Sequence, residues 1–194
     1  MDRLPTVIAA AALALACNDG GSSSSGTRER VNAVKAKAVE VDPAEMCDRY
    51  YAAGAGPKLA WPELVRPAAE VGAGAWRWIN LWATWCKPCV EELTRITGWH
   101  DRLSRSGAKV ELTLVSADES DDVVDAFREA HAGTPAGTRL ADSEAATAWI
   151  ASLGVKGATL PVHVFVDPAG HVRCVRASAI EDTDYAAVQA LLRQ

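Results

Sequence analysis

Two cysteines separated by two residues, Cys86 and Cys89, have the type and spacing that most directly suggest chemistry in this chain. They stand in the stretch INLWATWCKPCVEE, at the end of an apolar run that contains tryptophan. Thiols at this spacing can bind a metal ion, form a structural disulfide, or alternate between dithiol and disulfide. Which of these uses applies has to be inferred from the elements around the pair and from the other cysteines of the chain.

The segment before the pair predicts a buried strand, and the segment after it predicts a helix. Residues Ala75–Trp82 are apolar and aromatic with few interruptions. Beyond Cys89, apolar residues recur at spacings of three and four until the chain nears Gly107, which is typical of one helix face. Cys86 should therefore lie where a strand ends and a helix begins.

This position predicts different roles for the two thiols. Unpaired N–H groups and the helix dipole favour a thiolate at Cys86, which we expect to be the exposed nucleophile. Cys89, one turn further and more buried, is placed to resolve a mixed disulfide. Pro88 costs little in a first helical turn. We expect Trp85 to shield the pair and offer partners an apolar surface, and Lys87 either to stabilise the thiolate or to be solvated.

The remaining pattern predicts an α/β protein with a mixed sheet flanked by helices. Further strands are expected at Val110–Val115, Pro161–Val166 and His171–Ala177, and helices at Asp121–His131, Ser143–Leu153 and Asp184–Leu192. A strand–helix–strand unit implies a parallel pair, and the turn DPAG at 167–170 implies an antiparallel hairpin. This order resembles the thioredoxin fold, with Asp121–His131 as an inserted helix.

Residues from about 56 to 194 resemble the TlpA/ResA-like branch of the thioredoxin superfamily. WATWCKPC at 82–89 is nearly identical to the motif of that branch, W-A-T-W-C-x-P-C. Leu160 and Pro161 fall where the fold carries a cis-proline beside its active disulfide. Asn80 matches a position where this branch commonly has asparagine, and Glu92 matches its acidic residue near the thiols. Thr94 stands where the family usually has a helix-kinking proline.

The resemblance implies an exported thiol-disulfide oxidoreductase that uses no cofactor beyond its own redox-active disulfide. The implied catalytic residues are Cys86, Cys89, Pro161 and Glu92, and the implied neighbours of the redox site are Trp85, Lys87, Pro88 and Leu160. Glu92 is either a proton acceptor for Cys89 or an exposed helix charge. Disulfides of exported proteins would be reduced, in cytochrome c maturation or at metal-site thiols, and an upstream membrane reductase would supply electrons. We expect a monomer.

The N-terminus has the pattern of an export signal. The run from Leu4 to Ala16 carries no charge and is too short for a helix of about 20 residues that spans a bilayer. LALAC at 13–17 resembles a lipoprotein signal, which implies lipidation of Cys17; ordinary signal cleavage and an uncleaved terminus are the alternatives. We therefore expect a signal peptide over 1–16, a lipid-anchored tether and extension over 17–55 with a helix in Val31–Tyr51, and a thioredoxin-like domain over 56–194.

Export changes how the other cysteines are interpreted. With Cys17 assigned to the lipid, Cys47 and Cys174 remain outside the active pair. In a compartment where disulfides persist they can form a long-range bridge. Two unrelated buried thiols are the alternative, because the sequence does not give the distance between them.

Composition and motifs weigh against other classes of function. The 194 residues carry a net charge of −5 without a basic cluster, which argues against a nucleic-acid partner. A copper metallochaperone that binds metal through the CxxC is an alternative, but Met1 and Met46 are the only methionines. A thiol peroxidase would need a P-x-x-x-T-x-x-C motif, which is missing. No role is expected for His100, His131, His163 or His171, and Trp76, Trp78, Trp82 and Trp99 are expected to serve in packing.

Overall fold

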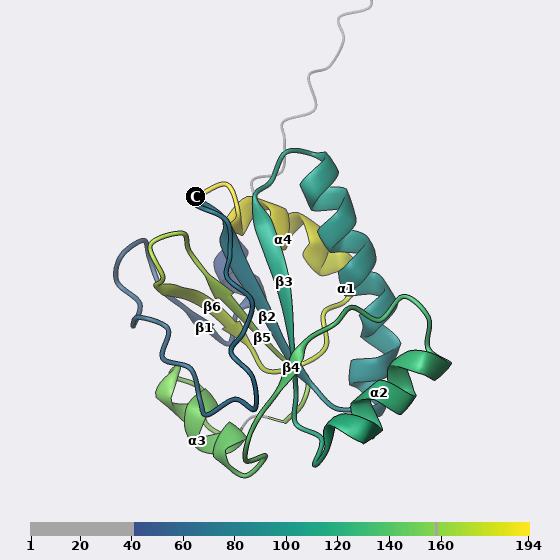
Figure 1. Cartoon of the computed structure of the whole chain (residues 1–194). Helices are drawn as coiled ribbons and strands as arrows, with labels where there is room; N and C mark the ends of the chain where they lie inside the picture. The colour runs from purple at the N-terminus through teal and green to yellow at the C-terminus, as the bar shows by residue number, and fades with distance from the viewer. Residues whose placement is uncertain (1–40, 158) are drawn as a thin grey trace, which may run out of the picture. The chain divides into compact units, whose positions relative to one another are not determined.

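The computed structural model describes residues 41–157 and 159–194 (Figure 1). The helices are η1 (Pro43–Met46), α1 (Lys87–Arg105), α2 (Asp121–Ala130), α3 (Ala145–Ser152), η2 (Asp182–Asp184) and α4 (Tyr185–Leu191). The strands are β1 (Arg49–Tyr50), β2 (Trp76–Trp82), β3 (Val110–Ser116), β4 (Thr138–Arg139), β5 (Val162–Val166) and β6 (Val172–Arg176). The predicted signal peptide, the lipidation site Cys17 and the tether lie outside these residues. Within them, every helix is too short or too polar to cross a membrane.

The strands form one six-stranded mixed sheet in the order β1-β6-β5-β2-β3-β4. β3 runs parallel to both β2 and β4, whereas β5 pairs antiparallel with β2 and β6. Figure 1 shows helices packed around this sheet. The α/β class and the mixed sheet that the sequence predicts are therefore confirmed, and each predicted strand and helix beyond residue 56 is present within a few residues of its expected bounds.

β2 is the strand that delivers the cysteines. All of its residues except Arg77 are buried, because its neighbours β3 and β5 pair with it along both edges and helices cover the sheet. α1 follows after a short turn and buries an apolar stripe that includes Leu93, Ile96 and Leu103. Trp99 on α1 meets Tyr185 on α4 edge-on, with ring centroids 5.1 Å apart. These contacts hold α1 against the core and α4.

The folded unit begins earlier than the predicted boundary at residue 56. Residues 41–51, which the sequence analysis places in a helix outside the domain, form η1 and then β1, and β1 pairs with β6. Met46 is only 3% exposed and belongs to the core. A Cβ on Gly56 would lie 1.8 Å from the carbonyl oxygen of Val172, so only glycine fits where this segment crosses β6. The segment is an integral part of the sheet.

A disulfide joins this segment to the opposite end of the chain. Cys47 follows η1, Cys174 lies in β6, and their Cα atoms are 5.5 Å apart across a sequence separation of 127. Of the two alternatives that the sequence leaves open, the structure contains the bridge.

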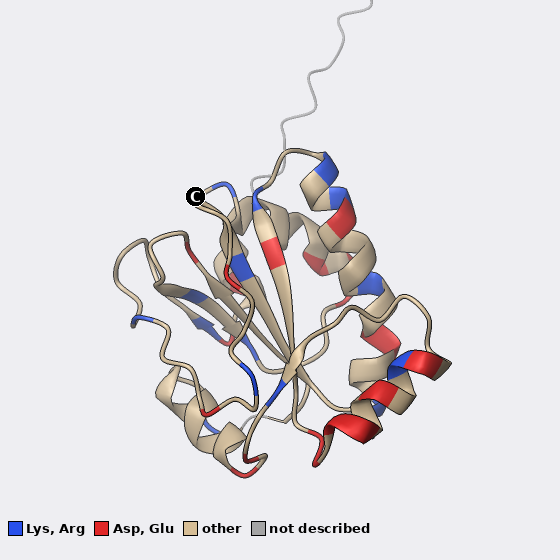
Figure 2. Cartoon of the chain, viewed as in Figure 1, with Lys and Arg blue, Asp and Glu red and all other residues tan. Residues whose placement is uncertain are grey.

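Charge is distributed unevenly over the elements. Figure 2 shows acidic residues gathered along α2, whose first turn carries Asp121 and Asp122. Lys and Arg are spread over several elements in the same view. Arg66 and Arg139 contact Asp121 at 2.7 Å and 3.3 Å, and the hydrogen bond from Arg66 holds the pKa of Asp121 below its usual value.

Candidate active site

Cys86 caps the N-terminus of α1, at the junction between β2 and the helix. The structure has a disulfide between Cys86 and Cys89, with Cα atoms 5.3 Å apart. The sulfur of Cys86 accepts a hydrogen bond from the backbone N–H of Cys89 at 3.3 Å. Backbone donors at a helix start stabilise negative charge, so the fold favours a thiolate at Cys86 once the disulfide is reduced.

The two sulfur-bearing residues differ in accessibility, but less than the sequence suggests. Cys86 is 6% exposed and Cys89 is 0% exposed. The expectation that Cys86 is exposed is therefore wrong for the disulfide form, in which the residue is buried. Cys86 still lines a surface groove, whereas Cys89 is fully buried and does not line it. A partner can reach only the Cys86 sulfur from this groove.

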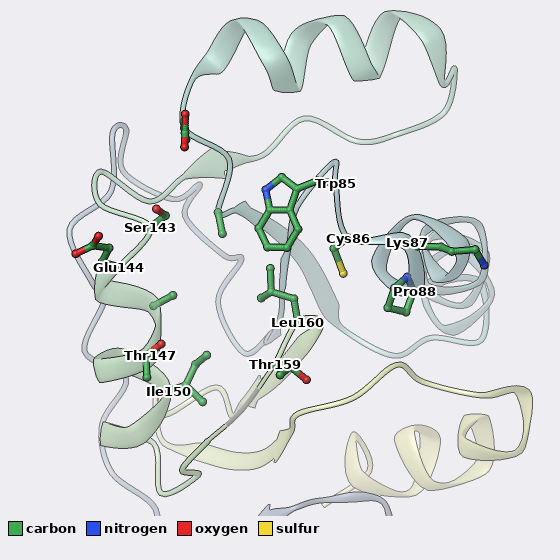
Figure 3. A pocket seen from close by; sticks show the side chains of 13 residues that line it. Trp85, Cys86, Lys87, Pro88, Ser143, Glu144, Thr147, Ile150, Thr159 and Leu160 are labelled. Atoms are coloured by element: carbon green, nitrogen blue, oxygen red, sulfur yellow. The ribbon is translucent and has the colours of Figure 1, made fainter.

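The groove has a volume of about 710 Å³ and runs from the active disulfide to α3 (Figure 3). It is lined by Trp85, Cys86, Lys87, Pro88, Ala117, Glu119, Ser143, Glu144, Ala146, Thr147, Ile150, Thr159 and Leu160. Figure 3 shows Trp85 and Leu160 near Cys86, with Glu144 and Ser143 on the opposite side. Trp85 is 69% exposed, one of the few large apolar side chains of the described residues that is open to solvent. The groove is apolar beside the cysteine and acidic beyond.

The other neighbours that the resemblance implies are also near the disulfide. The peptide bond between Leu160 and Pro161 is cis, Pro161 is buried, and Leu160 lines the groove. Pro88 lies in the first turn of α1. Lys87 is solvated, with its side chain 82% exposed, and forms an ion pair with Glu91 one turn along the helix. That pair partly neutralises the lysine charge near the thiol.

Glu92 is fully buried, so its alternative interpretation as an exposed helix charge is wrong. It lies three residues beyond Cys89 on the buried face of α1. Its carboxylate accepts hydrogen bonds from the Asn80 side chain at 2.9 Å and from the backbone N–H of Ile180 at 2.9 Å. The Nε2 atom of His163 lies 3.1 Å from it. Such donors compensate for the loss of water around a buried carboxylate.

His163 is a site residue that the sequence analysis misses. It is 0% exposed, lies in β5 directly opposite Asn80 of β2, and contacts Trp78 as well as Glu92. Its signal is faint in the sequence, because a single histidine within an apolar strand resembles any buried residue. The oxygen Oδ1 of Asn80 has no hydrogen-bond partner among the residues that the structure describes, which leaves one unmet acceptor in this network.

Asp118 is a second residue that the sequence analysis misses. Both of its carboxylate oxygens accept hydrogen bonds from the backbone N–H of Thr84, at 3.2 Å and 3.0 Å, and the Thr84 hydroxyl donates a third at 2.7 Å. Ser116 donates to it at 2.6 Å. Because β2 and β3 are parallel, the residues that follow them meet at one edge of the sheet, which could have indicated this contact. Asp118 thereby fixes the turn that precedes Cys86.

Comparisons with solved structures show which proteins share this fold. A secreted thiol-disulfide isomerase from Corynebacterium glutamicum is 19% identical, with 75% of this chain and 92% of that chain covered, at a TM-score of 0.57. A thioredoxin-related protein from Neisseria meningitidis serogroup B is 20% identical, with 62% and 86% covered, at a TM-score of 0.51. The chain has a thioredoxin-like fold. The comparison with curated protein sequences finds no match.

A sequence profile of one family matches residues 66–175, which is more than half of the chain. The chain belongs to the AhpC/TSA family. The matched range contains Cys86, Cys89, the residues that line the groove, and Asn80, Glu92 and His163, while Ile180 lies just beyond it. Across residues 41–157 and 159–194, no three His, Cys, Asp or Glu side chains are grouped as a metal site would require.

Proposed function

We propose that this protein is an exported thiol-disulfide oxidoreductase of the TlpA/ResA-like branch, which reduces disulfides of extracytoplasmic proteins through Cys86 and Cys89. The observation that carries the proposal is the Cys86–Cys89 disulfide at the N-terminus of α1, with Cys86 alone facing a surface groove. The cis-proline at 161 and the WATWCKPC stretch support the same chemistry. The dithiol carries the electrons itself, so no other cofactor is needed.

The first step is attack by Cys86 on a substrate disulfide. The reduced Cys86 thiolate displaces one substrate sulfur as a thiolate and forms a mixed disulfide with the other. The backbone N–H of Cys89, which contacts the Cys86 sulfur at 3.3 Å, stabilises the attacking thiolate. Trp85 and Leu160 present apolar surface to the chain that carries the substrate disulfide.

The second step is resolution by Cys89. Its thiol loses a proton, and the resulting thiolate attacks the Cys86 sulfur of the mixed disulfide. This closes the Cys86–Cys89 disulfide and releases the second substrate thiolate, so that two electrons have passed to the substrate. Glu92 is the nearest buried carboxylate along α1 and acts as the proton acceptor. An upstream membrane thiol reductase then restores the dithiol.

The groove favours a particular kind of substrate segment. An extended peptide bound beside Cys86 would pack apolar side chains against Trp85, Leu160 and Ile150, and its next residues would approach Glu119 and Glu144. These two carboxylates favour lysine or arginine on the peptide. The substrate class is therefore a disulfide flanked by apolar residues with a basic residue nearby.

Several features support action outside the cytoplasm. The uncharged run Leu4–Ala16 and the LALAC stretch support export and lipidation at Cys17, which would hold the domain at the outer side of a bacterial membrane. The Cys47–Cys174 disulfide suits an oxidising compartment. The relative from Corynebacterium glutamicum is itself secreted. The partners would be cytochrome c maturation proteins or other exported proteins with metal-site thiols.

The test is trapping of partners by the full-length protein in its host. Cys89→Ser should accumulate mixed disulfides between Cys86 and exported proteins, which are released by reductant and identified by mass spectrometry. Cys86→Ser is the matched control and should trap none. Equal trapping by both variants, or trapping of cytoplasmic proteins only, contradicts the proposal. Labelling with palmitate of the wild type, but not of Cys17→Ser, tests the anchor separately.

A further inference from the structure

The ring of His163 receives hydrogen bonds at one nitrogen and faces a carboxylate with the other. The indole N–H of Trp78 points at Nδ1 from 3.1 Å, and the Asn80 amide nitrogen lies 3.4 Å from the same atom. Nε2 lies 3.1 Å from the oxygens of Glu92. All of these side chains are 0% exposed. Water therefore does not compete for these contacts.

These contacts define where the proton of His163 resides. An indole nitrogen only donates, so Nδ1 must accept and carries no proton. The proton of the neutral ring is then on Nε2, which donates to Glu92. A second proton on Nδ1 would face the N–H groups of Trp78 and Asn80, both of which are donors. His163 is fixed as the neutral Nε2–H form.

We propose that His163 is a positioning residue that holds the buried Glu92 carboxylate, three residues beyond Cys89 on α1, and that its Nε2–H form, fixed by Trp78, is required for this. The proposal rests on the proposed function, because it assigns Glu92 the proton from Cys89. His163 is two residues beyond the cis-proline and connects β5 to α1 through its contact with Glu92. It is not the proton store, because neither ring nitrogen is free to accept a proton.

The hydrogen-bond donors around Glu92 are distributed over its two carboxylate oxygens. The N–H of Ile180 holds Oε2, the Asn80 amide holds Oε1, and His163 spans both. Rotation of the Asn80 amide would bring its unpartnered Oδ1 to Oε1, where it can accept the O–H of a protonated Glu92. Asn80 thus serves either protonation state, while His163 and Ile180 keep the carboxyl group in place.

The charged groups on the elements around Glu92 do not replace His163. Arg95, on the same helix, donates to the Ile180 carbonyl at 2.8 Å and to Asp182 at 2.9 Å. It also faces Glu181 at 3.7 Å. β2 contributes Asn80 and β5 contributes His163. Removal of His163 should therefore destabilise the Glu92 carboxylate, because none of these charged groups is placed to donate a hydrogen bond in its stead.

The experiment follows Cys89 by NMR in the reduced full-length protein, with carbon-labelled cysteine, so that it needs no substrate. When a carboxyl group is coupled to a thiol, the thiol signal follows pH in two steps, and the lower step belongs to the carboxyl. In His163→Leu the lower step should move measurably, because the carboxylate of Glu92 then lacks one of its hydrogen-bond donors. His163→Gln retains an amide N–H near the Nε2 position and should return the lower step most of the way to its wild-type pH. His131→Leu is the control and should leave the titration unchanged.

Nitrogen NMR of the wild type gives a second reading that requires no variant. The two ring nitrogens of His163 should show the Nε2–H pattern at neutral pH. In Trp78→Phe the ring should exchange between its two neutral tautomers, because the indole donor that fixes Nδ1 as an acceptor is lost. A protonated His163 near neutral pH, an Nδ1–H pattern, or an unchanged lower step in a folded His163→Leu would each overturn the proposal. If instead these shifts appear but Cys89→Ser traps no partner, the proposed function fails and the positioning role stands.

Discussion

The backbone N–H of Cys89 donates a hydrogen bond to the sulfur of Cys86 at 3.3 Å, so one cysteine supplies the donor that stabilises the thiolate of the other. The relationship is one-sided, because Cys89 is fully buried behind Cys86. The helix geometry thus separates an attacking sulfur from a resolving one within a single turn.

This asymmetry predicts an order of reactivity. In the reduced protein, Cys86 should be alkylated at neutral pH at least about ten times faster than Cys89, since the thiolate reacts and helix starts favour it. Cys86→Ser should abolish reduction of a model peptide disulfide. Mass spectrometry of partially alkylated protein measures the order, with Cys89→Ser as the control that retains fast labelling. Faster labelling of Cys89, or activity in Cys86→Ser, contradicts the assignment.

The Cys47–Cys174 disulfide should contribute strongly to stability. The bond closes a loop with a sequence separation of 127. Chain-entropy arithmetic for such a loop gives at most about 4 to 5 kcal/mol. The double variant Cys47→Ser/Cys174→Ser should therefore lower the free energy of urea unfolding by up to this amount. Peptide mapping under non-reducing conditions, after production in an oxidising compartment, should find the bond; two free thiols would exclude it.

The reduction potential should lie nearer the value of thioredoxin, about −270 mV, than that of the strong periplasmic oxidant, about −120 mV. The residue directly before Cys89 is Pro88, so no histidine stands there to stabilise the thiolate of Cys86. The charge of Lys87 is paired with Glu91 and open to solvent. Equilibration in defined glutathione ratios measures the midpoint. Lys87→Gln should change it by only about 10 mV, because exposed charges are screened. A midpoint above about −180 mV would indicate oxidation or isomerisation instead.

The acidic side of the groove should select basic substrates. Charge reversal by Glu119→Lys or Glu144→Lys should lower kcat/KM for a lysine-containing peptide disulfide by about threefold each, the scale of an exposed ion pair. The same variants should raise kcat/KM for a glutamate-containing peptide. Glu129→Lys, on the exposed side of α2, is the matched control. Equal changes in kcat/KM for both peptides would show that the groove does not select substrates by charge.

The contact of Asp121 with Arg66 predicts a pH effect on stability. Since the pKa of Asp121 is lowered in the folded state, its contribution is present above the unfolded pKa of about 4 and is lost as pH falls through the folded value. Asp121→Asn should therefore lower Tm slightly at pH 7. The difference from wild type should vanish near pH 2 in thermal scans by circular dichroism. A constant difference across this range would exclude the ionic origin.

The sequence predicts the fold well wherever the apolar residues of an element recur with a clear periodicity. β2 and α1 carry long apolar patterns, so their types and their junction at Cys86 follow from local rules. β1 and β4 have two residues each, and such strands exist only through their neighbours. The segment before residue 56 is misassigned for this reason, since its burial depends on β6.

The site residues also fall into those that local sequence patterns predict and those that depend on distant partners. Cys86 and Cys89 are predictable because their spacing carries the chemistry. Glu92 is ambiguous in sequence, since its burial depends on donors from β2, β5 and the segment around Ile180. His163 and Asp118 act through partners 71 and 34 positions away, which no local pattern reveals.

The two shortest strands have a consequence for solubility. β1 and β4 are the outermost strands of the sheet, so each border presents only a short row of unpaired backbone groups to other molecules. Longer flat borders recruit strands from other chains and lead to aggregation. On one side the bond between Cys47 and Cys174 prevents β1 from peeling away from β6. Loss of this bond would uncover the longer and more apolar β6, so a reduced protein should aggregate through that border before the rest of the domain unfolds.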